Sequence, residues 1–133
     1  MVSKEHSIKL ILKEFPDFNK QWDEYLSYWD GVSPNYSLEM SEFSRYVIEL
    51  LKKQRTDIEY VKKIFNFIEM LIIEGNEEVR TAVTTCLLEN LLNSVSWERI
   101  LSETFVPYLG IKSKEYCKSW DKFTGVKTPG LWD

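Results

Sequence analysis

The sequence predicts an all-α fold, and three features support this. Apolar residues recur at intervals of three and four along most of the chain, which is the period of an amphipathic helix. No stretch alternates well enough to predict a strand, and Gly, Pro and capping residues separate the helical stretches. With 133 residues, 44% of them hydrophobic and 29% charged, the chain suits one soluble globular domain over residues 1–133. We expect six or seven helices and an irregular C-terminal tail over residues 125–133.

The N-terminal part of the chain predicts three helices. The first covers about residues 3–15, and Pro16 with Asp17 opens the second, since Pro is tolerated in a first helical turn. A loop over residues 30–36, with Gly as a helix stop, precedes a third helix at about residues 37–53. The side chains expected to face inward from the second helix are Phe18, Trp22, Tyr25, Leu26 and Trp29.

The middle of the chain predicts a tight antiparallel hairpin of two helices. Asp57 looks like the cap of a helix that lasts until about Glu74 and is apolar nearly all round, which is typical of a central helix. Gly75 ends this helix and Asn76 caps the next, over about residues 76–92. Because the connection is so short, we expect the two helices to pack in opposite directions with the others around them.

The C-terminal part of the chain predicts two further helices. Ser96 is expected to cap one that reaches Phe105, and Ser113 begins the last, which ends before Gly125. An exposed Trp at a chain end is wasteful, so Trp132 is expected to dock on the domain or on a partner. The side chains expected to face inward from the last helix are Tyr116, Trp120 and Phe123.

One segment resembles the second helix of a HEAT-type repeat. That pattern has a polar capping residue, then Val-Arg, a small residue, and Leu some turns later. The resemblance covers about one repeat and implies a helical scaffold that binds other proteins. The positions that match the pattern are Asn76, Val79, Arg80, Ala82, Val83 and Leu87.

The C-terminal half carries a second resemblance. The run from Pro107 to Gly125, which follows the helical hairpin, is similar to the ending of a group of small bacterial helical proteins. Some of those proteins look like immunity proteins of polymorphic toxin systems. The resemblance implies a cytosolic protein that neutralises a toxin by binding it and covering its active site, and it assigns no functional residue.

Few residues suited to catalysis are present. His6 is the single histidine, and the five glycines all look like helix stops or turns, so no phosphate-binding loop is predicted. Two Cys and one His, without Cys-x-x-Cys spacing, predict no metal site and no cofactor. Adjacent acids on a helix point in different directions, so Asp23 and Glu24 form no catalytic pair. We therefore expect a non-enzymatic protein. The rival hypothesis, an enzyme using carboxylates in a helical cleft, predicts two acids with raised pKa values in one pocket.

Residues 14–49 are the candidate contact surface. They hold eight acids and two bases, a local net charge of −6, and nine aromatic residues. Acids steer a basic partner and aromatic groups anchor it, so we expect a protein partner that is itself basic. The other interpretation places Trp22 and Trp29 in the core and leaves the acids as a solvated face. The residues predicted to bind the partner are Asp23, Glu24, Tyr28, Asp30, Tyr36, Glu39 and Glu42.

The remaining charges suggest an alternative contact face. Residues 112–127 hold five Lys and two acids, a local net charge of +3, and Lys114, Lys118 and Lys122 form a stripe at intervals of four. The net charge of the whole chain, −4, disfavours nucleic acid as the main partner. A HEAT-like scaffold or adaptor without a toxin partner stays open as the second hypothesis, as does the oligomeric state.

The expected location is the cytoplasm. The longest apolar run is too short to span a bilayer, and no signal-peptide pattern opens the chain. Cys86 and Cys117 are far apart in a chain large enough to fold without a staple, so both are expected to be reduced thiols. Whether they have a redox role stays open.

Overall fold

The computed structural model describes residues 1–53 and 57–133, and it confirms the all-α prediction. Apart from one isolated bridge between Val2 and Gly75, all regular structure in these residues is helical. Within the same residues, no helix is both long and apolar enough to cross a bilayer. The α-helices are α1 (Lys4–Glu14), α2 (Asn19–Tyr28), α3 (Tyr36–Lys52), α4 (Ile58–Glu74), α5 (Glu77–Val83), α6 (Glu89–Ser96) and α7 (Ile111–Thr124).

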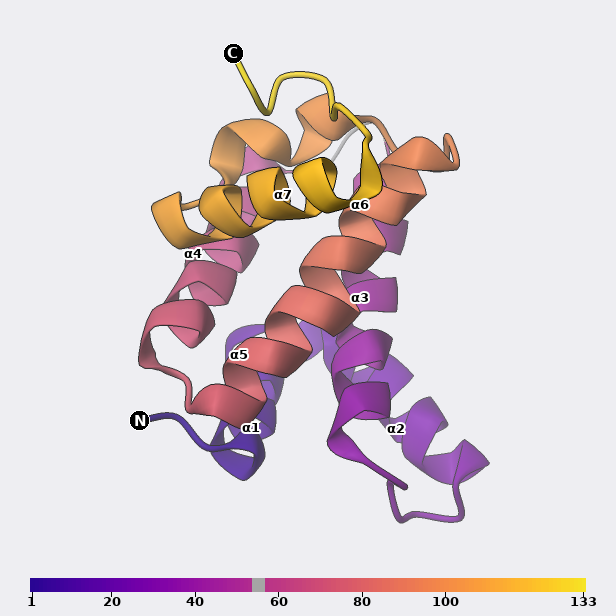
Figure 1. Ribbon diagram of the computed structural model, residues 1–133. Helices are drawn as coiled ribbons and strands as arrows, with labels where there is room; N and C mark the ends of the chain where they lie inside the picture. The colour runs from indigo at the N-terminus through magenta and orange to yellow at the C-terminus, as the bar shows by residue number, and fades with distance from the viewer. Residues whose placement is uncertain (54–56) are drawn as a thin grey trace.

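Helices α4 and α5 form the predicted hairpin. They run in opposite directions and diverge like the arms of a V, and α7 lies across the open end (Figure 1). Asn76 caps α5 as predicted, since its side chain accepts the N–H of Val79 at 3.0 Å. A Cβ on Gly75 would lie 2.3 Å from the carbonyl oxygen of Leu71, so only glycine allows this close turn.

Helices α5 and α6 are continuous through one π-helical turn, Thr84–Leu88. Threonine hydroxyls compete for the carbonyls of this region: Thr84 donates to the Arg80 carbonyl at 2.9 Å and Thr85 to that of Thr81 at 2.7 Å. Side-chain insertion of this kind distorts an α-helical ladder. The π turn contacts α3 and α7, so the continuous helix formed by α5, the π turn and α6 connects the N-terminal helices to α7.

The prediction that Ser96 begins a helix is wrong, because α6 runs through that residue. The helix ends with Glu98 in the left-handed region, at φ +59°. The N–H of Glu98 donates to the Val95 carbonyl at 3.0 Å, and the N–H of Arg99 donates to that of Ser94 at 2.8 Å. This is a Schellman ending with an acid where glycine is usual, so the sequence does not reveal it. Turns and two short 3-10 segments follow, Ser102–Thr104 and Val106–Tyr108.

The predicted inward face of α7 is right for Tyr116 and Trp120, which pack against the core, and wrong for Phe123. Phe123 is 80% exposed, while Tyr116 and Trp120 are half-buried at the edges of the contact. The buried face comprises Ser113, Cys117 and Asp121, at intervals of four. Two of these three are polar and are buried because each has hydrogen-bond partners there.

Asp121 fastens the irregular C-terminal tail. Its carboxylate accepts the Thr128 N–H at 2.7 Å, the Thr128 hydroxyl at 2.8 Å and the Trp132 indole N–H at 2.9 Å. The Nζ atoms of Lys118 and Lys122 lie 5.4 and 5.7 Å from the Trp132 ring centroid. Trp132 therefore docks on the domain, as the sequence predicts.

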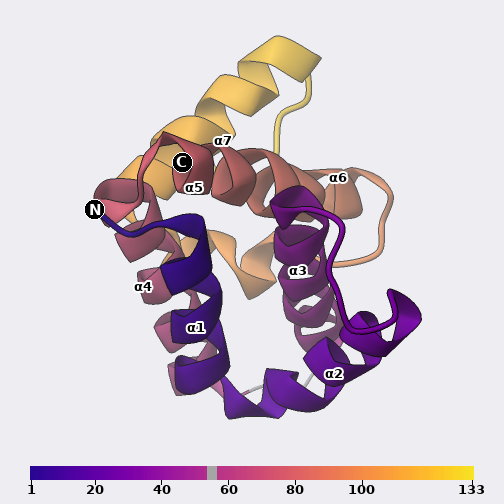
Figure 2. The same ribbon diagram turned by 90° about the horizontal axis from the view of Figure 1, so that it is seen from below.

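An aromatic cluster sets the position of α2. Phe15 at the end of α1 and Phe18 at the start of α2 both pack on Phe43 of α3, with ring centroids 5.6 and 5.4 Å apart. These three rings are almost fully buried. Figure 2 shows the result, with α1 beside α4 and the short α2 turned outward next to α3. The α2–α3 pair thus forms a projecting corner of the molecule.

Candidate functional site

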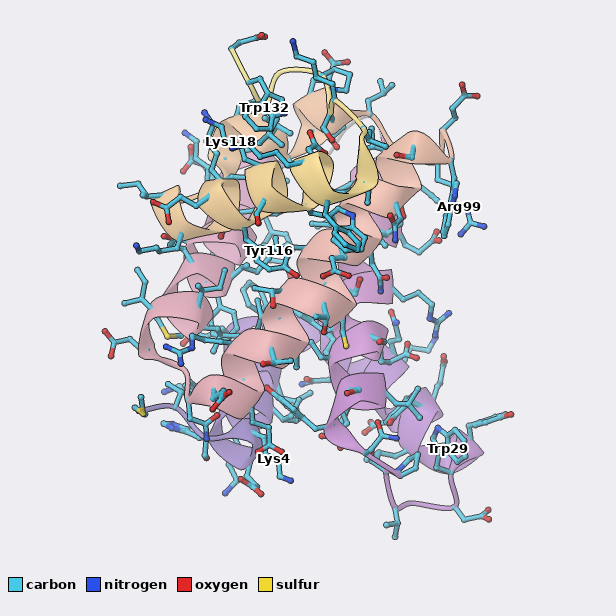
Figure 3. The ribbon with its side chains drawn as sticks, in the orientation of Figure 1. Lys4, Trp29, Arg99, Tyr116, Lys118 and Trp132 are labelled. Atoms are coloured by element: carbon cyan, nitrogen blue, oxygen red, sulfur yellow. The ribbon has the colours of Figure 1, made fainter. Side chains whose placement is uncertain are left out.

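The outer corner of the molecule is built by the end of α2. Asp30 adopts a left-handed φ of +55° and its N–H donates to the Ser27 carbonyl at 3.2 Å, while the N–H of Gly31 donates to that of Leu26 at 2.7 Å. This Schellman ending turns the chain away from the helix immediately after Trp29. The rings of Tyr28 and Trp29 then meet edge to face, with centroids 5.0 Å apart. Trp29 lies at the projecting corner in Figure 3.

A hydrogen-bond chain holds the loop over residues 29–35 against both helices. The Ser33 hydroxyl lies 2.7 Å from the Tyr25 hydroxyl of α2 and donates to Glu39 of α3 at 2.8 Å. Burial raises the pKa of Tyr25, and the nearby Glu39 and Glu42 raise it further against the lowering effect of Ser33. Asn35 caps α3 by accepting the Leu38 N–H at 2.9 Å. The corner is therefore ordered before any partner arrives.

A groove runs between α2 and α3. Its outer part is a hollow of about 480 Å³, and its inner part is a polar hollow of about 370 Å³. Glu24 and Arg45 line both parts, so the two hollows adjoin. We call this feature the acidic–aromatic groove. The residues lining its outer part are Glu24, Tyr25, Tyr28, Trp29, Leu38, Ser41, Glu42 and Arg45.

Glu42 is the most enclosed carboxylate of the groove, with its side chain 13% exposed. The Arg45 guanidinium donates to Glu42 Oε2 through Nη2 at 2.6 Å and Nε at 3.1 Å. The Gln21 side-chain amide donates to the same oxygen and to the Glu42 carbonyl oxygen. Glu42 is therefore already neutralised by a cation from its own helix.

Three of the seven predicted site residues converge on the groove, namely Glu24, Tyr28 and Glu42. Asp23 and Asp30 are exposed at the same corner without lining it. Glu39 is half-buried and supports the loop through Ser33. The five predicted acids therefore have different places. Two line the groove, two are exposed beside it, and one holds the loop in position.

Tyr36 is a correction to the predicted contact surface. It is only 8% exposed, and its hydroxyl lies 2.6 Å from that of Ser7 on α1, where burial raises its pKa to about 12. Trp29 is the converse case: predicted to be in the core, it is 38% exposed and lines the groove. The reason is that α2 ends at Tyr28, so the inward stripe does not continue to Trp29. Arg45, Leu38 and Ser41 also line the groove, and the sequence prediction of the site does not include them.

The basic stripe lies at the opposite end of the molecule. Figure 1 shows α7 and the tail at one end and α2 with its loop at the other. Lys118 and Lys122 already pack over Trp132, so part of the stripe holds the tail in place. The acidic region around α2 and the lysines of α7 therefore lie at opposite ends and do not cover each other.

The described residues contain no group of three metal-binding side chains. Glu69 on α4 is the carboxylate whose pKa departs clearly from its usual value. Burial raises that pKa, but hydrogen bonds from the backbone of Lys112 and Ser113 and from the Ser113 hydroxyl outweigh this and lower it overall. This is the opposite of the shift that the carboxylate-enzyme hypothesis predicts.

Comparison with known proteins places the chain in a family. Residues 8–125 match the family described as Domain of unknown function (DUF7674). The chain belongs to this family. The DUF7674 match extends from α1 to the end of α7 and includes the whole acidic–aromatic groove. No curated protein and no solved structure matches the chain.

Proposed function

We propose that this DUF7674 protein is a non-enzymatic binding protein whose acidic–aromatic groove receives a basic segment of a partner protein. The observation that carries the proposal is the convergence of Glu24, Glu42, Tyr28 and Trp29 on one hollow. Carboxylates attract a cationic side chain, and aromatic faces hold it through cation–π contact. The size of the hollow, about 480 Å³, leaves room for an arginine or lysine side chain.

Glu24 is the carboxylate of the outer hollow that remains for a partner's cation. Glu42 already pairs with Arg45, whose side chain is 63% exposed, so the partner's basic group is expected on the Glu24 side, away from that like charge. The inner hollow is lined by three acids and three bases, so the net negative charge of the groove lies in its outer part, where Glu24 and Glu42 face one base. The attraction for a basic partner segment is therefore centred on the outer part of the groove.

The polarity of the molecule supports fast association. The acidic corner projects from one end, while the lysines of α7 lie at the other. A basic partner is attracted to the corner and repelled by α7, which orients the encounter. The biological role that we propose is that of an immunity protein: binding at the groove covers the active site of a toxin in a bacterial cytoplasm.

The test is capture of the partner from a lysate of the native host with the tagged chain. Wild type is compared with a groove variant, Glu24→Lys with Tyr28→Ala, in which both residues are exposed and folding is expected to be unchanged. The matched control carries an exposed acid and an exposed aromatic on α7, Glu115→Lys with Phe123→Ala. We expect one basic protein to be retained at low salt and released at high salt.

The groove variant is expected to bind that protein about tenfold more weakly, and the control variant as tightly as wild type. The identity of the retained protein then decides the immunity role. Loss of binding in the α7 control alone refutes the groove and favours the lysine stripe. A partner held equally by all three proteins and insensitive to salt favours the alternative of a HEAT-like scaffold or adaptor.

A further inference from the structure

A second hollow, larger than either part of the groove, lies elsewhere on the molecule. It has a volume of about 770 Å³ and lies where the end of α6, the segment over residues 97–109, the start of α7 and the tail meet. In Figure 1 this is the end of the molecule that carries α7 and the C-terminus. Its volume lies within the range of about 300–1,000 Å³ that is usual for small-ligand sites. The apolar residues that line it include Val95, Ile100, Leu101, Val106, Leu109 and Pro129.

The walls of this hollow are held in place by the fold. On one side, the left-handed turn at Glu98 closes α6 and directs the following chain around the hollow. On the other side, Pro129 and Gly130 form the wall contributed by the tail, and Asp121 holds that tail on α7 through Thr128. Leu131, next to Gly130, is fully buried. The hollow therefore exists without a ligand to shape it.

Three charged residues line the hollow: Glu98, Glu103 and Lys114. Within residues 1–53 and 57–133, none of them takes part in an ion pair. Two carboxylates against one ammonium give the lining a net negative charge. A ligand that combines an apolar body with one cationic group matches both the apolar walls and this charge.

We propose that this hollow binds a small amphipathic amine. The apolar body of the ligand packs on Ile100, Leu101 and Val106, and its ammonium group pairs with the carboxylates of Glu98 and Glu103. Lys114 limits the favoured ligand to a single cationic group, since a second would meet a like charge. This site is independent of the acidic–aromatic groove, with which it shares no lining residue.

The test uses three probes with the same eight-carbon chain: 1-octylamine, 1-octanol and octanoate. Each is titrated calorimetrically into the full chain at pH 7 and low salt. We expect one saturable site, with 1-octylamine bound most tightly and octanoate least. Leu101→Ser is expected to weaken 1-octylamine and 1-octanol alike. The control, Ile111→Ser, removes a comparably exposed apolar side chain that does not line the hollow, and binding is expected to be unchanged.

A second variant tests whether Glu98 and Glu103 pair with the ammonium group of the ligand. Glu98→Gln with Glu103→Gln is expected to weaken 1-octylamine about fivefold and to leave 1-octanol unchanged, while Glu115→Gln changes neither. The proposal is overturned if no saturable binding occurs, if octanoate binds as tightly as 1-octylamine, or if Leu101→Ser has no effect. None of these results depends on whether a partner protein is captured at the groove.

Discussion

Glu69 of α4 closes the N-terminus of α7 by binding Ser113. Its Oε1 accepts the Ser113 N–H at 2.9 Å and the Ser113 hydroxyl at 2.7 Å, and its Oε2 accepts the Lys112 N–H at 2.8 Å. Gly110, the residue before α7, has no side chain to cap the helix. A carboxylate from another helix therefore supplies the acceptors and the negative charge that a helix N-terminus favours.

The first prediction is that Glu69→Gln destabilises the fold by about 1 kcal/mol at pH 7, because one amide oxygen replaces two acceptors. Folding lowers the pKa of Glu69 below 4.5, so this stabilisation is complete above pH 4.5 and is lost as pH falls through the folded value. Urea unfolding at pH 7 and pH 3 measures both effects, with Glu115→Gln as an exposed control on α7. If wild type exceeds Glu69→Gln in unfolding free energy by the same amount at both pH values, the assigned role of the ionised Glu69 carboxylate is contradicted.

The second prediction concerns the close approach of Gly110 to Glu69. A Cβ on Gly110 would lie 2.4 Å from Glu69 Cδ, so in Gly110→Ala the Glu69 carboxylate must move away from the N-terminus of α7. We expect the unfolding free energy to fall by about 1–3 kcal/mol. In a Glu69→Ala background the obstacle is gone, and the same substitution is expected to cost much less. Urea unfolding of the two single variants and the double variant gives the coupling free energy. Strictly additive effects would show that the two residues do not interact.

The third prediction concerns the tail. Asp121 is 2% exposed and accepts three hydrogen bonds, so Asp121→Asn removes the negative charge that strengthens them and makes the Thr128 hydroxyl turn to accept from an NH₂ group. A loss of about 1–3 kcal/mol in unfolding free energy is expected, with faster removal of the tail by carboxypeptidase. Asp133→Asn changes an exposed acid of the same tail and serves as the control. Equal digestion rates for wild type and Asp121→Asn would refute the fastening role of Asp121.

The fourth prediction separates the two thiols. Cys117 is fully buried, and burial, with a smaller effect of Asp121, raises its pKa to about 12. Cys86 is partly exposed on the π turn. A disulfide reagent at pH 8 should therefore modify one thiol rapidly in the native protein and both in urea. Rapid modification of Cys117 in the native state would mean that α7 detaches from the domain on the time scale of the reaction.

The sequence predicts those helix starts and ends that carry a local signal. Asp57 and Asn76 are visible as caps because each bonds an N–H within its own first turn. Glu98 ends α6 in the left-handed region, where Gly is the usual signal, so that end is hidden, whereas Gly31 marks the end of α2 in the sequence. The error at α6 produced a helix that does not exist, over residues 96–105.

The buried face of α7 and part of the site were missed for a tertiary reason. Ser113 and Asp121 are polar, and only their partners on α4 and the tail make them interior residues. Local apolar periodicity therefore favours the neighbouring aromatic face. In the same way, Tyr36 is buried because its hydroxyl forms a hydrogen bond with that of Ser7 on α1. The two residues are 29 positions apart, so no local pattern reveals the contact. Charge and aromatic content alone indicate residues 14–49 as the candidate contact region.

The central claim is that a partner binds at the acidic–aromatic groove. The most direct measurement is a two-dimensional amide NMR spectrum of the isotopically labelled chain, recorded free and with the captured partner. We expect the largest shift changes at Glu24, Tyr28, Trp29 and Arg45, and their reduction at high salt. Changes confined to α7 around Lys114 and Lys118, with the groove signals unmoved, would contradict the account.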